Sequence, residues 1–139
     1  MLLTASGAEF LTGLPNNFID VDSNEWYTDY VLSAQKVGIV GGISADEFGV
    51  GRNIIRQDAA LMLERALGVM IEQESELFSD DDDIADYASG AVYAMRKTGL
   101  INGYEGNIFK PLGFLSRAEA AVIIVRFLSV KNQNKGGIF

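Results

Sequence analysis

The chain contains no cysteine and no histidine among its 139 residues. The lack of cysteine excludes disulfides and thiolate nucleophiles, and the lack of both residues removes the usual ligands of structural zinc. Without histidine, the commonest general base in enzymes is also missing. No two carboxylates are spaced in a way that demands acid–base catalysis. We therefore expect no catalytic site, no metal site and no cofactor.

Positive charge is scarce as well. The chain has 11 Lys and Arg against 19 Asp and Glu, and this net charge of -8 opposes nonspecific binding to nucleic acid or to an anionic membrane. No apolar run approaches the roughly 18 residues of a membrane span, and the first residues lack the basic-then-apolar layout of a signal peptide. We expect no nucleic-acid partner, no membrane insertion, and an export signal, where one exists, outside this sequence.

What the chain does contain is a repeat of about sixty residues. The tripeptide Phe18-Ile19-Asp20 recurs as Phe78-Ser79-Asp80, 60 residues later. Four more residues recur at an offset of 61, namely Gly38, Gly42, Phe48 and Arg56 as Gly99, Gly103, Phe109 and Arg117. This spacing predicts one repeat over residues 18–72, a second over 78–130 and a tail at 131–139.

Each repeat has the pattern of a helix, a glycine-rich loop and a second helix. In the first copy, Asp22 or Ser23 is a candidate N-cap and Gly38 a stop signal. Apolar residues at helical spacing lie between these ends: Trp26, Tyr30, Val31, Ala34 and Val37, with Tyr87, Ala91, Val92 and Met95 in the second copy. We expect the loop phenylalanines of the two copies to anchor the loops to the core.

The second helix of each repeat begins at an arginine. Ser116 and Glu119 have the S-x-x-E spacing of a capping box, which predicts a helix start at Arg117. In the first copy Ile55 occupies the cap position, so we expect a looser start at Arg56. Behind the arginines, we expect core stripes formed by Ala60, Leu63 and Leu67 and by Ala121, Ile124 and Leu128.

An arginine at a helix start is unfavourable unless an anion lies nearby, because that end already has about half a positive charge. A bound carboxylate would supply the anion, and the planar guanidinium suits such a group. The alternative is an ion pair within the chain, for example with Asp20 or Asp80.

In order and spacing, these features resemble the S-layer homology (SLH) repeat. The most specific piece is Leu115-Ser116-Arg117-Ala118-Glu119, which is similar to the family's I-T-R-A-E signature, and the segment at Ile54-Ile55-Arg56 is a weaker copy. The resemblance implies an all-α fold in which helix–loop–helix repeats form a pseudo-threefold bundle. It also implies an exported protein of the cell wall or S-layer.

In that family, grooves between repeats bind a secondary cell-wall polysaccharide with a pyruvylated amino sugar, and the signature arginine contacts the pyruvyl acid. The resemblance therefore implies noncovalent anchoring to the bacterial cell wall, with Arg117 as the principal contact and Arg56 as a weaker one. The complete set of expected ligand-binding residues is Arg117, Arg56, Ser116, Glu119, Gly103, Tyr104, Trp26 and Tyr87.

Several alternatives stay open at this point. Trp26 and Tyr87 belong either to a sugar-stacking face or to the core, and core packing is favoured for Trp26. The acids from Asp80 to Asp83 either favour the following helix start or form a loose calcium site, and the first is preferred. Residues 1–17 either hold the end of a third repeat, with Glu9 aligned to Glu119, or do not. The whole chain is either a wall anchor or a protein-interaction module that pairs with a second copy or a further repeat.

Overall fold

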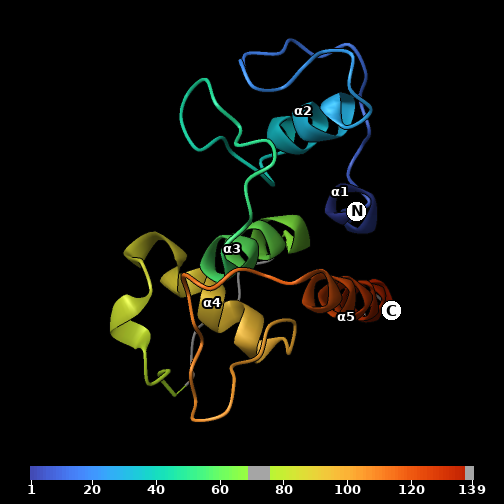
Figure 1. Ribbon diagram of the computed structural model, residues 1–139. Coiled ribbons are helices and arrows are strands. Elements are labelled where there is room, and N and C mark those ends of the chain that lie inside the picture. Colours follow the sequence, from blue (N-terminus) through green and yellow to red (C-terminus); the bar gives the residue numbers. More distant parts are fainter. Residues whose placement is uncertain (69–75, 137–139) are drawn as a thin grey trace. The chain divides into compact units, whose positions relative to one another are not determined.

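The computed structural model describes residues 1–68 and 76–136, and in these ranges it is all helix and loop (Figure 1). The helices are α1 (Leu2–Ser6), α2 (Thr28–Lys36), α3 (Arg56–Leu67), the short 3-10 helix η1 (Asp81–Asp83), α4 (Asp86–Lys97) and α5 (Arg117–Gly136). Pairing between extended segments is limited, over the same ranges, to two isolated bridges, Ile55 with Phe114 and Tyr104 with Ile108. The expected all-α fold class is confirmed.

The chain forms two compact units, Met1–Arg52 and Asn53–Phe139. The division falls inside the first sequence repeat, because its first helix α2 belongs to one unit and its second helix α3 to the other. In the second unit α3 packs along α4 and also contacts α5 (Figure 1). The second helix of one repeat therefore shares a core with the helices of the next repeat.

The same aspartate organises the glycine-rich loop in both repeats. The Asp20 carboxylate accepts hydrogen bonds from the backbone N–H groups of Phe48, Gly49 and Val50 at 2.7–2.9 Å. These bonds, that of Phe48 above all, lower the pKa of Asp20. Asp80 accepts equivalent bonds from Phe109 and Lys110, each at 2.8 Å. For Asp80, the interpretation that the acid serves the following helix start is wrong, because its carboxylate binds the loop and makes no cap bond to η1.

A glycine is required where each loop crosses an aromatic ring. A Cβ at Gly103 would lie 2.6 Å from Phe78 Cε1, and one at Gly42 would lie 2.8 Å from Phe18 Cε1. Both distances are well inside van der Waals contact. Phe109, which is fully buried, packs on Phe78 at 5.3 Å between ring centroids, so the expected anchoring of the loop is confirmed.

Helix α3 begins at Arg56 without a side-chain cap, as the sequence predicted, but its start is not loose. The N–H groups of Arg56 and Gln57 donate to the carbonyl oxygens of Gly113 and Pro111 at 2.9 and 3.1 Å. The loop of the second repeat thus satisfies the helix start of the first, which replaces the missing serine. In contrast, Ser116 and Glu119 form the predicted capping box at the start of α5.

Helix α2 starts later than predicted, at Thr28, because Asp22 is not its N-cap. The Asp22 carboxylate instead accepts a bond from the N–H of Asn24 in a local turn. Trp26 therefore precedes the helix and is 81% exposed, which makes the favoured core placement wrong. The buried face of α2 consists of Thr28, Leu32, Ser33 and Ala34.

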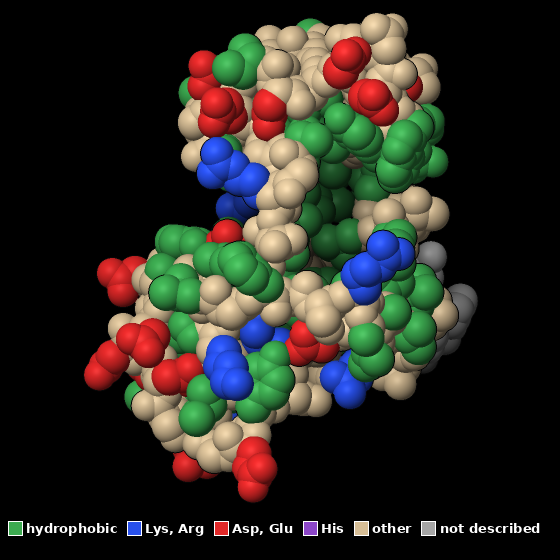
Figure 2. All heavy atoms as spheres, viewed as in Figure 1, with side chains coloured by type: hydrophobic (Ala, Val, Ile, Leu, Met, Phe, Trp, Pro, Cys, Tyr) green, Lys and Arg blue, Asp and Glu red, His purple; other side chains and the backbone are tan. Residues whose placement is uncertain are grey.

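The core stripe of α3 is confirmed at Ala60 and Leu63, which are both buried. The stripe expected on α5 is wrong, because Ile123 and Phe127 are buried there, while Leu128 is 42% exposed. The helix is rotated relative to the predicted stripe. Hydrophobic side chains remain on its surface, where Figure 2 shows them over α5.

The N-terminal segment does not match the arginine-led helices. Helix α1 ends at Ser6, and residues 8–18 are not helical, so the alignment that set Glu9 on Glu119 is wrong. The segment packs on α2 instead. Leu11 exchanges two backbone hydrogen bonds with the Ser33 hydroxyl at 2.9 and 3.0 Å, and the Phe10 ring lies 4.7 Å from that of Tyr30.

No helix in the described ranges has both the length and the hydrophobicity that crossing a bilayer would take.

Candidate functional site

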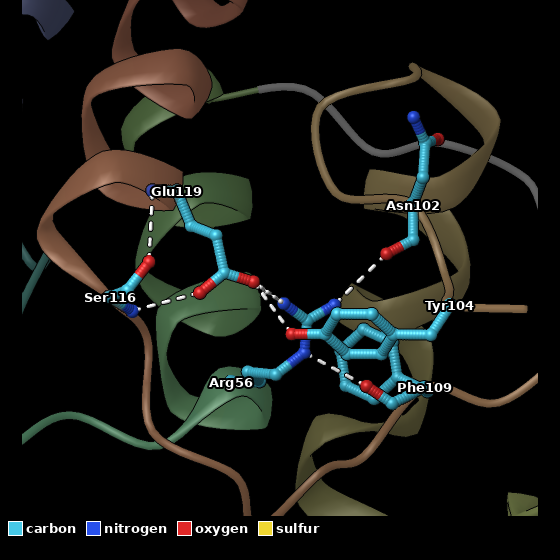
Figure 3. Close-up of polar contacts among 6 residues, drawn as sticks. All are labelled: Arg56, Asn102, Tyr104, Phe109, Ser116 and Glu119. Carbon is cyan, nitrogen blue, oxygen red and sulfur yellow. Dashed lines mark hydrogen bonds and ion pairs between the residues drawn. The ribbon is translucent and has the colours of Figure 1, made fainter.

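Arg56 is the centre of the most elaborate polar cluster in the described part of the chain. Its side chain leaves the start of α3 and is only 4% exposed. Nε donates to the Phe109 carbonyl oxygen at 2.8 Å, and Nη2 donates to that of Asn102 at 2.9 Å. Nη1 forms an ion pair with Glu119 Oε1 at 3.1 Å (Figure 3). The first repeat therefore supplies a cation that the second repeat binds.

Two aromatic rings flank the same guanidinium. Cζ of Arg56 lies 4.5 Å from the centroid of the Tyr104 ring and 5.0 Å from that of Phe109 (Figure 3). Cation–π contacts of this kind contribute most when the cation is removed from water. The ion-pair alternative considered for the arginines holds for Arg56, with Glu119 as its partner rather than Asp20 or Asp80.

Glu119 joins the capping box to this cluster. Oε2 accepts from the Ser116 N–H at 2.9 Å, and Oε1 accepts from the Tyr104 hydroxyl at 2.6 Å. The hydrogen bond from Tyr104 is the largest cause that lowers the pKa of Glu119, followed by the bonds from Ser116, and the value falls to about 2. The same contact raises the pKa of Tyr104. Glu119 thus stays ionised at neutral pH and neutralises Arg56.

Beside this cluster lies a cavity of about 320 Å³. One wall is formed by α5, where Glu119, Val122, Ile123 and Arg126 share a face because they follow helical spacing. Arg126 is exposed and has no hydrogen bond or ion pair within residues 1–68 and 76–136. The complete lining is Arg56, Leu100, Ile101, Asn102, Tyr104, Ala118, Glu119, Val122, Ile123 and Arg126.

Four of the residues that the sequence singled out meet here: Arg56, Tyr104, Ser116 and Glu119. Gly103 adjoins them, and the approach of the Phe78 ring explains why it is glycine. Arg117 lies at the start of α5 but does not line the cavity; it is exposed and makes no hydrogen bond or ion pair to the described residues.

The two remaining predicted residues lie elsewhere. The Tyr87 hydroxyl donates to Asp58 at 2.6 Å and accepts from Gln57 at 3.1 Å, and the bond to Asp58 raises its pKa. Tyr87 is therefore tied to the first turn of α3. Trp26 belongs to the Met1–Arg52 unit, where its ring packs edge-on against Tyr27 at 5.7 Å.

Sequence reasoning missed Arg126 and Asn102. Arg126 could have been found, because it lies seven residues after Glu119 and helical spacing places both on one face. Asn102 contributes its backbone carbonyl, so its residue type carried no signal. As for metals, no cluster of three acidic side chains arranged to hold an ion occurs in the described residues.

A family model described as the S-layer homology domain matches the chain twice, over residues 17–60 and 77–121. Together these segments cover well over half of the sequence. The chain belongs to the S-layer homology domain family. Both matches end within the first turns of an arginine-led helix, so they include Arg56 in the first SLH repeat and Arg117 and Glu119 in the second.

Relatives of this SLH chain carry different names. It is 33% identical over 120 residues to an exoglucanase, XynX, of Acetivibrio thermocellus, which covers 83% of this chain and 11% of the relative. It is 29% identical to a surface-layer 125 kDa protein of Lysinibacillus sphaericus, over 79% of this chain and 10% of the relative. It is 27% identical to the S-layer protein sap of Bacillus anthracis, over 86% and 14%. The chain thus spans only about a tenth of these proteins.

Proposed function

We propose that this SLH segment anchors its parent protein noncovalently to the bacterial cell wall, outside the cell. Family membership and the surface-layer relatives support a role at the cell surface. The relatives named for glycan-degrading enzymes share the same segment with relatives named for surface layers. A segment common to proteins of such different names is better explained as an attachment module than as a catalytic one.

The proposed ligand is a secondary cell-wall polysaccharide with a pyruvylated amino sugar, bound in the cavity beside Arg56. The single observation that carries this proposal is the combination of an unpaired cation, an aromatic ring and an apolar wall in that cavity. Sugars present apolar C–H faces, and a ketal-linked pyruvate adds a carboxylate. Val122 and Tyr104 would contact the sugar ring, and the ligand acid would pair with a cation.

Arg126 is the cation that this proposal favours. Arg56 also lines the cavity, but Glu119 neutralises it and each of its three side-chain nitrogens already donates to an acceptor within the chain. A guanidinium without a protein partner can form a bidentate pair with a carboxylate at lower cost, because no existing ion pair has to break. Arg117 stays a second proposed contact, since it matches the family signature and is exposed.

Calorimetric titration with purified wall polymer tests this proposal. A charge-assisted hydrogen bond contributes about 1.5–3 kcal/mol, so Arg126→Ala should weaken binding at least about tenfold. Removal of the pyruvate from the polymer should cause a similar loss in the unmodified protein. Arg65→Ala is a matched control, because Arg65 is exposed near the end of α3, outside the cavity, and its loss changes the net charge equally. Equal affinity of the Arg126→Ala and Arg65→Ala variants would contradict the proposed site.

A pairing module is the second candidate function, and the surface of α5 favours it. Val125 is 64% exposed and Leu128 is 42% exposed on this helix, and Arg117 stands free at its start. Arg56 donates to carbonyl oxygens in the glycine-rich loop of the repeat that follows it. The glycine-rich loop of another SLH repeat, in a second copy or another chain, would fit Arg117 in the same way. Light scattering would detect the pairing of two copies. Such pairing would not depend on pyruvate, whereas the proposed binding to the wall polymer would.

A further inference from the structure

Lys110 has a backbone conformation that its residue type disfavours. Its φ is +58°, in the left-handed region, and among the described non-glycine residues only Asn107 shares this property. The equivalent position of the first repeat, 61 residues earlier, is Gly49 with φ +95°. Both positions donate their N–H to the aspartate that organises the loop. The loop therefore requires the positive φ, and glycine would adopt it with less strain.

Asn107 shows how the fold accounts for such a residue. Its side chain donates to the Leu77 carbonyl at 2.8 Å and accepts from Arg96 at 2.9 Å, and asparagine tolerates this conformation. The Lys110 side chain makes no such bond. It is exposed, and its one side-chain interaction within the described residues is with the Tyr104 ring, whose centroid lies 4.7 Å from Nζ. The loop thus holds a strained lysine whose side chain contributes no hydrogen bond or ion pair to the described part of the fold.

The position of Lys110 relates this strain to the cavity. Tyr104 lines the cavity, and two cations approach its ring: Arg56, at 4.5 Å, and Lys110. Arg56 is neutralised by Glu119, whereas Lys110 has no ion-pair partner in the described part of the chain. Lys110 therefore adds an unpaired ammonium group next to the aromatic part of the proposed binding site, from a different element than Arg126.

We propose that Lys110 is a binding residue whose ammonium group pairs with a carboxylate of the acidic wall polysaccharide while that ligand contacts Tyr104. This inference rests on the proposed function and assigns a second cation to the same site. Strain persists at ligand sites when the side chain is needed for binding rather than for folding. The first repeat, with Gly49 at the equivalent position, has no such cation.

The test is a pair of variants, Lys110→Gly and Lys110→Arg, titrated with purified pyruvylated wall polymer. Lys110→Gly should weaken binding by about fivefold or more, as the loss of one exposed charge-assisted contact does. Its melting temperature should stay the same or rise, because glycine adopts the positive φ without strain. Lys110→Arg restores the charge and should bind within about twofold of the unmodified protein. Arg65→Ala again controls for net charge.

Two results of these titrations would contradict a binding role for Lys110. Unchanged affinity of Lys110→Gly would overturn the inference, and so would a loss of affinity accompanied by a clearly lower melting temperature, since that pair indicates a structural role through Tyr104. The failure of the proposed function looks different, because in that case the unmodified protein itself does not bind the polymer.

Discussion

Arg56 and Arg117 occupy the same position of the two repeats, yet their replacement by alanine should have very different consequences for stability. Arg56 donates three hydrogen bonds from a nearly buried position, two of them to carbonyl oxygens and one to Glu119. Even at about 1 kcal/mol net for each bond, which is below the usual value of a charge-assisted bond, Arg56→Ala should destabilise the Asn53–Phe139 unit by at least about 3 kcal/mol. It also leaves the Glu119 carboxylate without its cation. Arg117 is exposed and has no partner in the described structure, so Arg117→Ala should change stability by less than about 0.5 kcal/mol.

Thermal unfolding followed by circular dichroism provides the comparison. A loss of 3 kcal/mol corresponds to a fall of about 12–24 °C in melting temperature for a unit of this size, whereas Arg117→Ala should melt with the unmodified protein. Arg56→Lys is an informative intermediate, because it keeps the charge but loses the fork that serves two carbonyls and a carboxylate. Equal destabilisation by Arg56→Ala and Arg117→Ala, or none by either, would refute the cluster as described.

The pKa of Glu119 is lowered from 4.5 to about 2, so the contribution of its carboxylate to stability is complete above pH 4.5 and is lost as the pH falls toward 2. Glu119→Gln should therefore flatten the fall of the melting temperature over that pH range, and an unchanged profile would contradict this. Gly103→Ala should lower the free energy of unfolding by about 1–3 kcal/mol, because its Cβ would meet the Phe78 ring. Gly41→Ala, whose Cβ would have no atom within 4 Å, should leave it unchanged, and a denaturant titration of both variants compares them. Deletion of residues 1–14 removes the bonds of Leu11 to Ser33 and the packing of Leu14, so amide hydrogen exchange in α2 should accelerate while α4 keeps its protection. Equal protection of α2 with and without the segment would show that residues 1–14 do not stabilise this helix.

Local features of the sequence predicted structure well. The Ser116 to Glu119 capping box needed only a four-residue pattern, and the structure confirms it, with α5 starting at Arg117. The repeat offset likewise predicted that Phe109 would anchor its loop. Such features depend on residues a few positions apart or on two copies of one pattern, so they can be read without knowledge of the fold.

Long-range features could not be predicted in the same way. The start of α3 appeared uncapped, because its acceptors, Pro111 and Gly113, lie more than fifty residues away in the loop of the other repeat. The partner of Arg56 was missed for the same reason. Helical spacing alone also misplaced two features. Trp26 precedes α2, which starts only at Thr28, so the helical pattern does not apply to it. On α5 the spacing is correct, but the helix is rotated about its axis and buries Ile123 and Phe127 instead of the predicted stripe.

The decisive experiment is a parallel titration of the unmodified protein and Arg126→Ala with purified secondary cell-wall polymer, with and without its ketal-linked pyruvate. We expect measurable binding that weakens at least about tenfold when either the pyruvate or the Arg126 guanidinium is removed, with a less than additive loss when both are absent. Absence of binding by the unmodified protein, or equal affinity for the polymer with and without pyruvate, would contradict this expectation.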